Sequence, residues 1–290
     1  MISINQNKIA KSNKQFELPG KTLSSSVTLI YLGAMLIIPM AMLLLAFFKL
    51  PLATIIETLN DPRLWHAFKI TIFTALIAAI INLVFGTLIA WIQARYAYRG
   101  KSIVSMLIDL PFALPTAVTG IALTATFSKQ THIGQWLHNI GIDVNYTPLG
   151  ITIAMIFIGI PFVIRQVEPI LEEIGSEMEQ AAQMLGASQF QIATKIILPN
   201  IIPAALAGFT AAFARGLGEY GSVIFISGNM PMKTEVVSLL IVSKLEQFDY
   251  AGATIISVAM ITLSLLFLLI SNGLQYLQKR KYGFTQKEAH

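Results

Sequence analysis

Three ionisable side chains, Asp109, Arg215 and Glu219, lie within long apolar stretches of the sequence. A charge inside a membrane is costly, so such residues usually face a bundle interior or a water-filled path and often have a function. Arg215 and Glu219 are four residues apart, which places them on one helix face where they can pair. Arg215 could attract an anion along a pathway. Because Glu219 would cancel much of its field, we favour a structural or gating role for the pair, and a structural role for Asp109.

Two enzymatic interpretations of these stretches are weaker. Asp109 and Glu219 could be the acid and base of an intramembrane enzyme, but nothing in their spacing makes them converge on one cavity. The sequence also contains a G-x-G-x-x-G pattern, which in dinucleotide-binding proteins follows a strand. No strand is expected here, so we interpret its glycines, Gly216, Gly218 and Gly221, as small residues at close helix contacts.

Motifs for nucleotide and metal binding are absent from the sequence. It has no G-x-x-x-x-G-K-[ST] loop, no cysteine and no closely spaced histidines. We therefore expect no nucleotide site, metal site or other cofactor in this chain.

The composition is that of a membrane protein. Hydrophobic residues make up 55% of the 290 residues and charged residues only 12%, whereas soluble domains have about a quarter charged residues. A net charge of +5 could suggest a nucleic-acid partner, but the basic residues form no patch interleaved with aromatic residues. Since a backbone exposed to lipid must satisfy its own hydrogen bonds, the expected fold class is all-α and polytopic.

Six apolar stretches are long enough to cross a bilayer as helices, which takes about 20 residues. They cover approximately 27–48, 65–91, 103–127, 149–167, 201–226 and 251–277, with polar tails at 1–26 and 278–290. We interpret the first as an uncleaved span. Pro111 and Pro115 each remove a helix hydrogen bond, so the third span should be kinked or broken. An apolar stripe within 234–245 predicts a short helix on the outer face.

The basic residues predict the orientation of these spans. Thirteen Lys and Arg residues lie on one side, six lie on the other, and Arg215 is inside a span. Basic residues concentrate on the cytoplasmic side of a membrane. The chain is therefore expected to be a multi-pass membrane protein with both termini, and the segment between the fourth and fifth spans, on the cytoplasmic side.

The segment 172–199 has the pattern of two short helices separated by a break. The first has an acidic beginning that includes Glu179 and a small surface at 181–182, and it should end at Gly186. The second should begin at Ser188, a suitable N-cap. A small-residue surface beside a sharp turn suits the docking of another protein. The alternative is an ordinary amphipathic connection between two spans.

This segment resembles the cytoplasmic loop of the permease subunits of type I, binding-protein-dependent ABC importers, which have the MetI-like fold. That loop has Glu-Ala-Ala, then a glycine after three residues, then Ile-x-Leu-Pro after nine more. The chain matches at Ala181, Ala182, Gly186, Ile196, Leu198 and Pro199. Gln180 stands in place of the family's glutamate, next to Glu179. The resemblance implies coupling helices that seat in a groove of an ATPase subunit, within a transporter core at 67–272.

Other stretches resemble the T or U permease subunits of sulfate/thiosulfate importers, from about residue 18 to residue 278. They are 109–123, 160–165, 213–226, 228–229 and 244–250. Molybdate permeases share the element at 214–219, so a molybdate or other oxyanion permease is the alternative. An ion-coupled secondary carrier is a less favoured one.

The resemblance also implies the partners of the chain. We expect a transport subunit with no enzymatic activity of its own, driven by ATP hydrolysis on a separate chain. The expected partners are two copies of an ABC ATPase, a second homologous permease subunit, a periplasmic sulfate/thiosulfate-binding protein and membrane lipid, with no nucleic acid.

Overall fold

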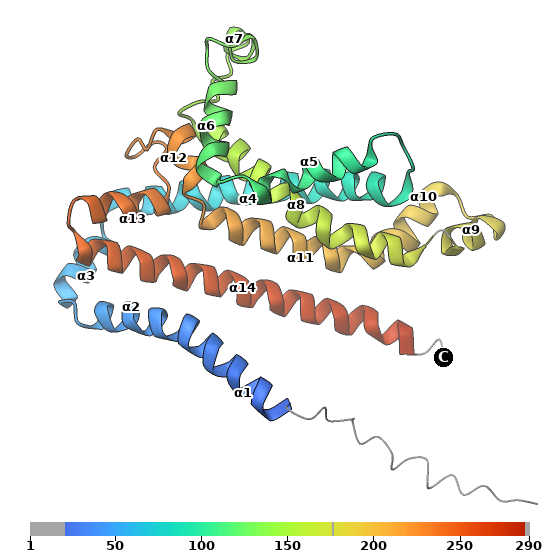
Figure 1. The fold of residues 1–290 in the computed structure, drawn as a ribbon, viewed down its shortest axis with the longest axis horizontal. Helices are drawn as coiled ribbons and strands as arrows, with labels where there is room; N and C mark the ends of the chain where they lie inside the picture. The colour runs from blue at the N-terminus through green and yellow to red at the C-terminus, as the bar shows by residue number, and fades with distance from the viewer. Residues whose placement is uncertain (1–20, 176, 288–290) are drawn as a thin grey trace, which may run out of the picture. The chain divides into compact units, whose positions relative to one another are not determined.

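The structure is a computed structural model that describes residues 21–175 and 177–287 (Figure 1). It divides into two units between Leu50 and Pro51. The first unit contains α1 (Lys21–Leu32), a π-helical turn (Gly33–Ile37) and α2 (Ile38–Phe48), which follow one another without a break. Most of the predicted N-terminal tail, and the last three residues of the predicted C-terminal tail, lie outside the described residues.

The second unit is helical throughout the part of the chain that the structure describes. Its helices are α3 (Leu52–Leu59), α4 (Pro62–Arg95), α5 (Lys101–Ala113), α6 (Thr116–Thr126), α7 (His132–Asn139), α8 (Pro148–Ile174), α9 (Glu177–Met184), α10 (Gln189–Ile192), α11 (Leu198–Leu217), α12 (Gly221–Ser227), α13 (Val237–Glu246) and α14 (Tyr250–Lys287), with a π-helical turn (Ala193–Ile197) before α11. Figure 1 shows α9 and α13 near opposite ends of α4, α8 and α11.

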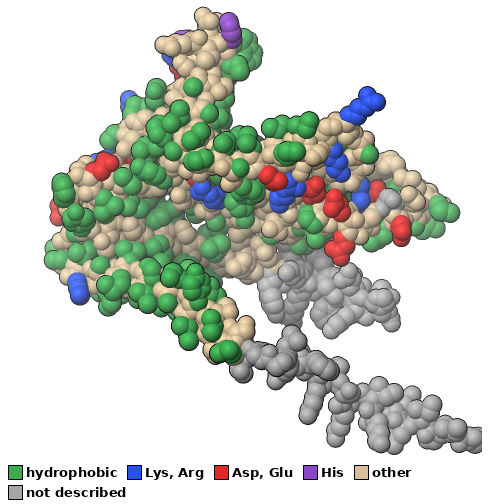
Figure 2. All heavy atoms as spheres, in the orientation of Figure 1, with side chains coloured by type: hydrophobic (Ala, Val, Ile, Leu, Met, Phe, Trp, Pro, Cys, Tyr) green, Lys and Arg blue, Asp and Glu red, His purple; other side chains and the backbone are tan. Residues whose placement is uncertain are grey.

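Within residues 21–175 and 177–287, five helical stretches are long and apolar enough to cross a membrane. They cover Leu23–Phe48, Pro62–Arg95, Pro148–Ile174, Gln189–Leu217 and Tyr250–Gly273. The bent pair α5 and α6 makes a sixth if it counts as one span. The prediction of an all-α protein with about six spans is therefore confirmed. On the face drawn in Figure 2, most of the charged side chains lie toward the end that carries α9.

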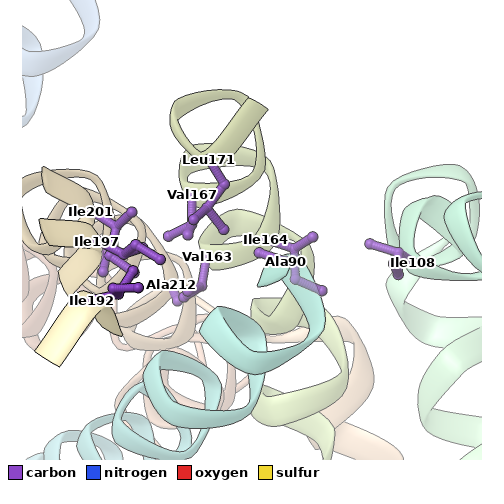
Figure 3. Packing of buried hydrophobic residues seen from close by; sticks show 11 residues of the cluster. Ala90, Ile108, Val163, Ile164, Val167, Leu171, Ile192, Ile197, Ile201 and Ala212 are labelled. Atoms are coloured by element: carbon purple, nitrogen blue, oxygen red, sulfur yellow. The ribbon is translucent and has the colours of Figure 1, made fainter. Parts of the chain in front are cut away.

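Helices α4, α8 and α11 form the core of the second unit. Figure 3 shows Val163 and Val167 of α8 on the side of Ile197 and Ile201, while Ile164 approaches Ala90 of α4. All these side chains are buried, so α8 is the middle helix of this cluster.

Glycines let these helices approach closely. A Cβ atom added at Gly208 of α11 would lie 2.6 Å from the Cα atom of Val163, and one at Gly86 of α4 would lie 2.9 Å from the Val163 Cβ atom. Of the glycines in the G-x-G-x-x-G pattern, Gly216 and Gly221 are at close contacts, as predicted. The prediction is wrong for Gly218, whose Cβ position has no described atom within 4 Å.

Two of the predicted spans are broken. The third divides into α5 and α6, which differ in direction by 112° on either side of Leu114 and Pro115. Pro111 lies inside α5, so the break occurs at the second proline. The prediction that 201–226 is one span is wrong, because α11 ends at Leu217 and α12 begins at Gly221.

The second halves of the two broken spans, α6 and α12, pack together through glycines. A Cβ atom at Gly120 of α6 would lie 2.8 Å from the Cα atom of Ser222, and one at Gly221 would collide with the Thr116 hydroxyl. At Gly120 no side chain separates the two helices, so the backbones are in direct contact there. At Gly221 the nearest atoms are those of the Thr116 side chain and the Ala117 amide.

The predicted short helix within 234–245 is α13, but its apolar side chains are buried. Val237 and Leu240 are 0% and 1% exposed, and the Val237 amide donates a hydrogen bond of 2.9 Å to the Thr71 hydroxyl of α4. Asp249 follows and caps α14 by accepting a bond of 2.8 Å from the Gly252 amide. This bond and the Lys244 ammonium lower the pKa of Asp249. Much of the stretch 244–250 thus has a structural function.

Candidate functional site

The predicted break in the segment 172–199 is confirmed at Gly186, which has a φ of +84°. The Gly186 amide donates to the Gln183 carbonyl at 2.9 Å, and the Ala187 amide donates to the Ala182 carbonyl at 3.0 Å. These two bonds form the Schellman motif that ends many helices, and its positive φ favours glycine. The reversal between α9 and α10 therefore depends on this residue.

The predicted N-cap at Ser188 is also confirmed. Its hydroxyl accepts a hydrogen bond from the Gln191 amide at 3.3 Å, and the Gln191 side chain accepts one from the Ser188 amide at 2.9 Å. This reciprocal pair is a capping box, which satisfies two amides at a helix start. The local signals in this segment thus determine where α9 ends and where α10 begins.

The residues that match the family loop fall on two faces. Ala182 and Ile196 pack against the core cluster, so they attach the loop to the membrane helices. Ala181, Gly186 and Leu198 are exposed, and Pro199 is half-buried. The motif therefore combines residues that hold the loop in place with residues that a partner could contact.

A second set of exposed residues was not predicted. Met184 and Leu185 are each 89% exposed at the end of α9, and Phe190 is 76% exposed on α10. Three large apolar side chains on both sides of one turn form an exposed surface of the kind that marks a protein contact. Their presence beside the glycine break, in an otherwise polar segment, was the sequence signal that could have identified them.

The acidic residue of this loop is paired within the chain. Oε1 of Glu179 lies 2.7 Å from Nη2 of Arg95, the last residue of α4. Neither atom makes a hydrogen bond of acceptable angle among the described residues, so the contact is ionic. Gln180, its neighbour, is exposed. Glu179 thus contacts the membrane helices and is half-buried there.

The predicted ion pair between Arg215 and Glu219 is present at the break between α11 and α12. Nη1 of Arg215 lies 2.5 Å from Oε2 of Glu219. The helix ends at Leu217, so the pair forms across the following turn and not along one helix face as expected. Oε1 of Glu219 accepts hydrogen bonds from the Ser222 amide at 2.9 Å and the Ser222 hydroxyl at 3.0 Å. Each oxygen of the Glu219 carboxylate therefore has a partner: Oε2 pairs with Arg215 and Oε1 accepts from Ser222.

The two members of this pair differ in exposure. The Glu219 side chain is 1% exposed and the Arg215 side chain is 35% exposed. The Ser238 hydroxyl of α13 donates to the Glu219 carbonyl at 2.6 Å. The break is thus fixed from α12 and α13, while the guanidinium of Arg215 remains accessible on one side.

Asp109 has its own partner. It accepts hydrogen bonds from Arg165 of α8, at 2.8 Å from Nε and 2.6 Å from Nη2. Arg165 also pairs with Glu168 at 2.8 Å. Asp109 therefore joins α5 to α8. Since Asp109 and Glu219 are each engaged by a different arginine, the structure does not bring them together as an acid–base pair.

Comparisons with known proteins agree with this arrangement. Residues 86–283 match the family model described as "Binding-protein-dependent transport system inner membrane component". The chain is 45% identical to the sulfate transport system permease protein CysT of Escherichia coli, over 89% of this chain and 93% of that protein. It is 43% identical to the protein of the same name from Synechococcus elongatus, over 88% and 92%.

Solved structures share the fold. A bacterial ABC transporter involved in the import of the acidic polysaccharide alginate matches with a TM-score of 0.73 at 18% identity, over 89% of this chain and 96% of that chain. A methionine ABC transporter in an inward-facing conformation matches with a TM-score of 0.52 at 16% identity, over 76% and 99%. The resemblance to type I permeases is confirmed: the chain belongs to the family of binding-protein-dependent transport system inner membrane components.

Proposed function

We propose that this chain is the permease subunit of an ABC importer that moves sulfate or thiosulfate across the bacterial inner membrane, driven by ATP hydrolysis on separate subunits. The observation that carries this proposal is the 45% identity to a sulfate transport system permease over 89% of the chain. The transporter core comprises residues 67–272.

Complementation tests the substrate. The chain should restore sulfate-dependent growth and uptake of labelled sulfate in a bacterium that lacks its own T subunit but keeps the rest of the importer. Molybdate uptake, measured alongside, should not change. Restored molybdate uptake without sulfate uptake would favour the alternative oxyanion, and uptake by this chain alone under an ion gradient would favour a secondary carrier.

The partners follow from the same proposal. The importer contains two ATPase subunits, one of which contacts the coupling segment, residues 172–199. A second homologous permease completes the membrane domain, and a periplasmic binding protein delivers the anion. The exposed apolar surface of Met184, Leu185 and Phe190 supports the ATPase contact. The family's dependence on a binding protein supports the third partner.

The coupling segment and both termini lie in the cytoplasm. The excess of Lys and Arg on that side supports this orientation. Because the chain has no cysteine, single cysteines introduced at Ser188 and Gln130 can be labelled without background. A membrane-impermeant thiol reagent should label the first only from the cytoplasm and the second only from the periplasm. The reverse pattern would contradict the orientation.

Gly186→Phe should leave the chain in the membrane but uncouple it from the ATPase. A bulky L residue at a φ of +84° is strained by about 1–3 kcal/mol, which would change the turn between α9 and α10. Gly186→Asn is the matched control, because asparagine tolerates this conformation and should keep coupling. Sulfate uptake and co-purification of the ATPase measure the effect. Normal values for the Phe variant would count against the docking assignment.

Arg215 and Glu219 have a gating function in this proposal. Arg215→Gln should lower the maximal rate of sulfate uptake with little change in the half-saturation constant, because the pair holds the α11–α12 break and Glu219 already offsets the charge. Arg215→Lys keeps the charge and should retain part of the rate. If Arg215→Gln instead raised the half-saturation constant at a nearly normal maximal rate, in a stable complex, Arg215 would contact the anion directly.

A further inference from the structure

Helix α4 has an arginine–glutamate pair at each end. At its C-terminal end, Arg95 lies 2.7 Å from Glu179 of α9. In its first turn, Arg63 donates two hydrogen bonds to Glu235, which precedes α13: one of 2.7 Å from Nε and one of 2.6 Å from Nη2. A single helix thus joins the coupling segment to the opposite end of the second unit.

The pair at the α9 end differs from an ordinary surface ion pair, which contributes little. The Arg95 and Glu179 side chains are only 13% and 20% exposed. Arg95 is in the last turn of α4 and Glu179 is in the first turn of α9. A cation at a helix C-terminus and an anion near a helix N-terminus are each stabilised by the helix dipole. Both charges are therefore placed where their helices favour them.

Helix α9 lies between two glycines with positive φ angles. Gly175 has a φ of +65° and Gly186 has a φ of +84°. Its large apolar side chains Met184 and Leu185 point away from the unit. The Arg95–Glu179 pair is a direct polar contact from α9 to α4. A force applied to the exposed surface of α9 can therefore reach α4 through this contact.

Helix α4 is suited to carry such a force. It has 34 residues and no proline after Pro62 at its start. It also packs closely against α8 at Gly86. A long helix without a kink in such contact behaves as a rigid element.

The other end of α4 leads to the α11–α12 break. Arg63 and Thr71 of α4 hold the start of α13, through Glu235 and through the Val237 amide at 2.9 Å. The next residue of α13, Ser238, donates its hydroxyl to the Glu219 carbonyl at 2.6 Å. Hydrogen bonds therefore connect α4 to Glu219 through α13.

We propose that the Arg95–Glu179 pair makes α4 the element through which movement of α9 changes the α11–α12 break. Arg95 and Glu179 are positioning residues, since they contact neither the anion nor ATP. This assignment rests on the proposed function. Glu179 would then act through a contact within this chain, whereas the family's docking glutamate corresponds to the next position, Gln180.

The test compares coupling with assembly in the complete importer, reconstituted in proteoliposomes with its ATPase and binding protein. Glu179→Gln and Arg95→Gln should each keep ATP hydrolysis but lower the sulfate transported per ATP by about five-fold or more. The double variant Arg95→Glu with Glu179→Arg should bring this ratio back toward the wild-type value. Arg99→Gln changes an exposed charge near the same end of α4 and should leave the ratio unchanged.

A merely structural pair would give a different result. Loss of assembled complex would lower sulfate uptake and ATP hydrolysis in proportion, and the ratio would not change. That outcome, or a lowered ratio that the charge exchange does not raise, would overturn the proposal. Failure of the proposed function is distinct, because the wild-type importer would then take up no sulfate.

Discussion

Leu185→Asp is expected to abolish sulfate uptake while the chain remains in the membrane. Leu185 is 89% exposed at the end of α9, beside the equally exposed Met184. A charge at the centre of an apolar contact leaves a buried carboxylate without a partner. Loss of one central residue of this kind costs about 2 kcal/mol or more, which is roughly 30-fold in affinity. Co-purification of the ATPase with the tagged permease measures this loss.

Leu185→Met provides the matched control. It keeps an apolar side chain of similar volume on the same turn, so ATPase binding and uptake should be close to the wild-type values. Wild-type co-purification of the ATPase with Leu185→Asp would show that the surface of Met184, Leu185 and Phe190 is not the contact.

Gly208→Ala is expected to destabilise the permease strongly. The added Cβ atom would lie 2.6 Å from the Cα atom of Val163, and a backbone atom cannot move aside as a flexible side chain can. Overpacking of a tight core costs about 1–3 kcal/mol, and here it separates α8 from α11 at the middle of the unit. Thermal unfolding of the purified protein in detergent should show a lower midpoint and less folded protein.

Gly273→Ala makes the same chemical change in open space. Its Cβ position in α14 has no neighbour within 4 Å among the described residues. Alanine is favoured over glycine in a helix by about 0.5–1 kcal/mol, so this variant should be as stable as the wild type or slightly more stable. Equal midpoints for the two variants would contradict the close contact at Gly208.

Sequence reasoning succeeded where the physical cause is local. The turn at Gly186 and the cap at Ser188 depend on residues within five positions, and both are present as predicted. The Arg215–Glu219 pair was found for the same reason, although a turn and not a helix brings the two together. The lengths of the apolar stretches likewise predicted the all-α class.

The remaining features depend on packing between distant segments. Three ion pairs join residues so far apart in the sequence that their spacing could not predict the contact. They are Arg95 with Glu179, Arg63 with Glu235, and Asp109 with Arg165. The exposure of Leu185 depends on the direction of α9. That direction is determined by the turn at Gly186 and also by the packing of Ala182 against the core cluster, which the sequence alone does not predict. The end of α11 at Leu217 was missed because α12 begins only four residues later and again contains apolar residues, so the sequence resembles one interrupted span.

The direct backbone contact between α6 and α12 limits how the third and fifth spans can rearrange. At Gly120 the backbone of α6 meets the backbone of Ser222, and no side chain lies between them whose rotamers could absorb a shift. Sliding of either helix would bring these backbone atoms into collision, so α6 and α12 have few independent degrees of freedom. We therefore expect the two helices to move as one body when the chain rearranges at the breaks at 114–115 and 218–220.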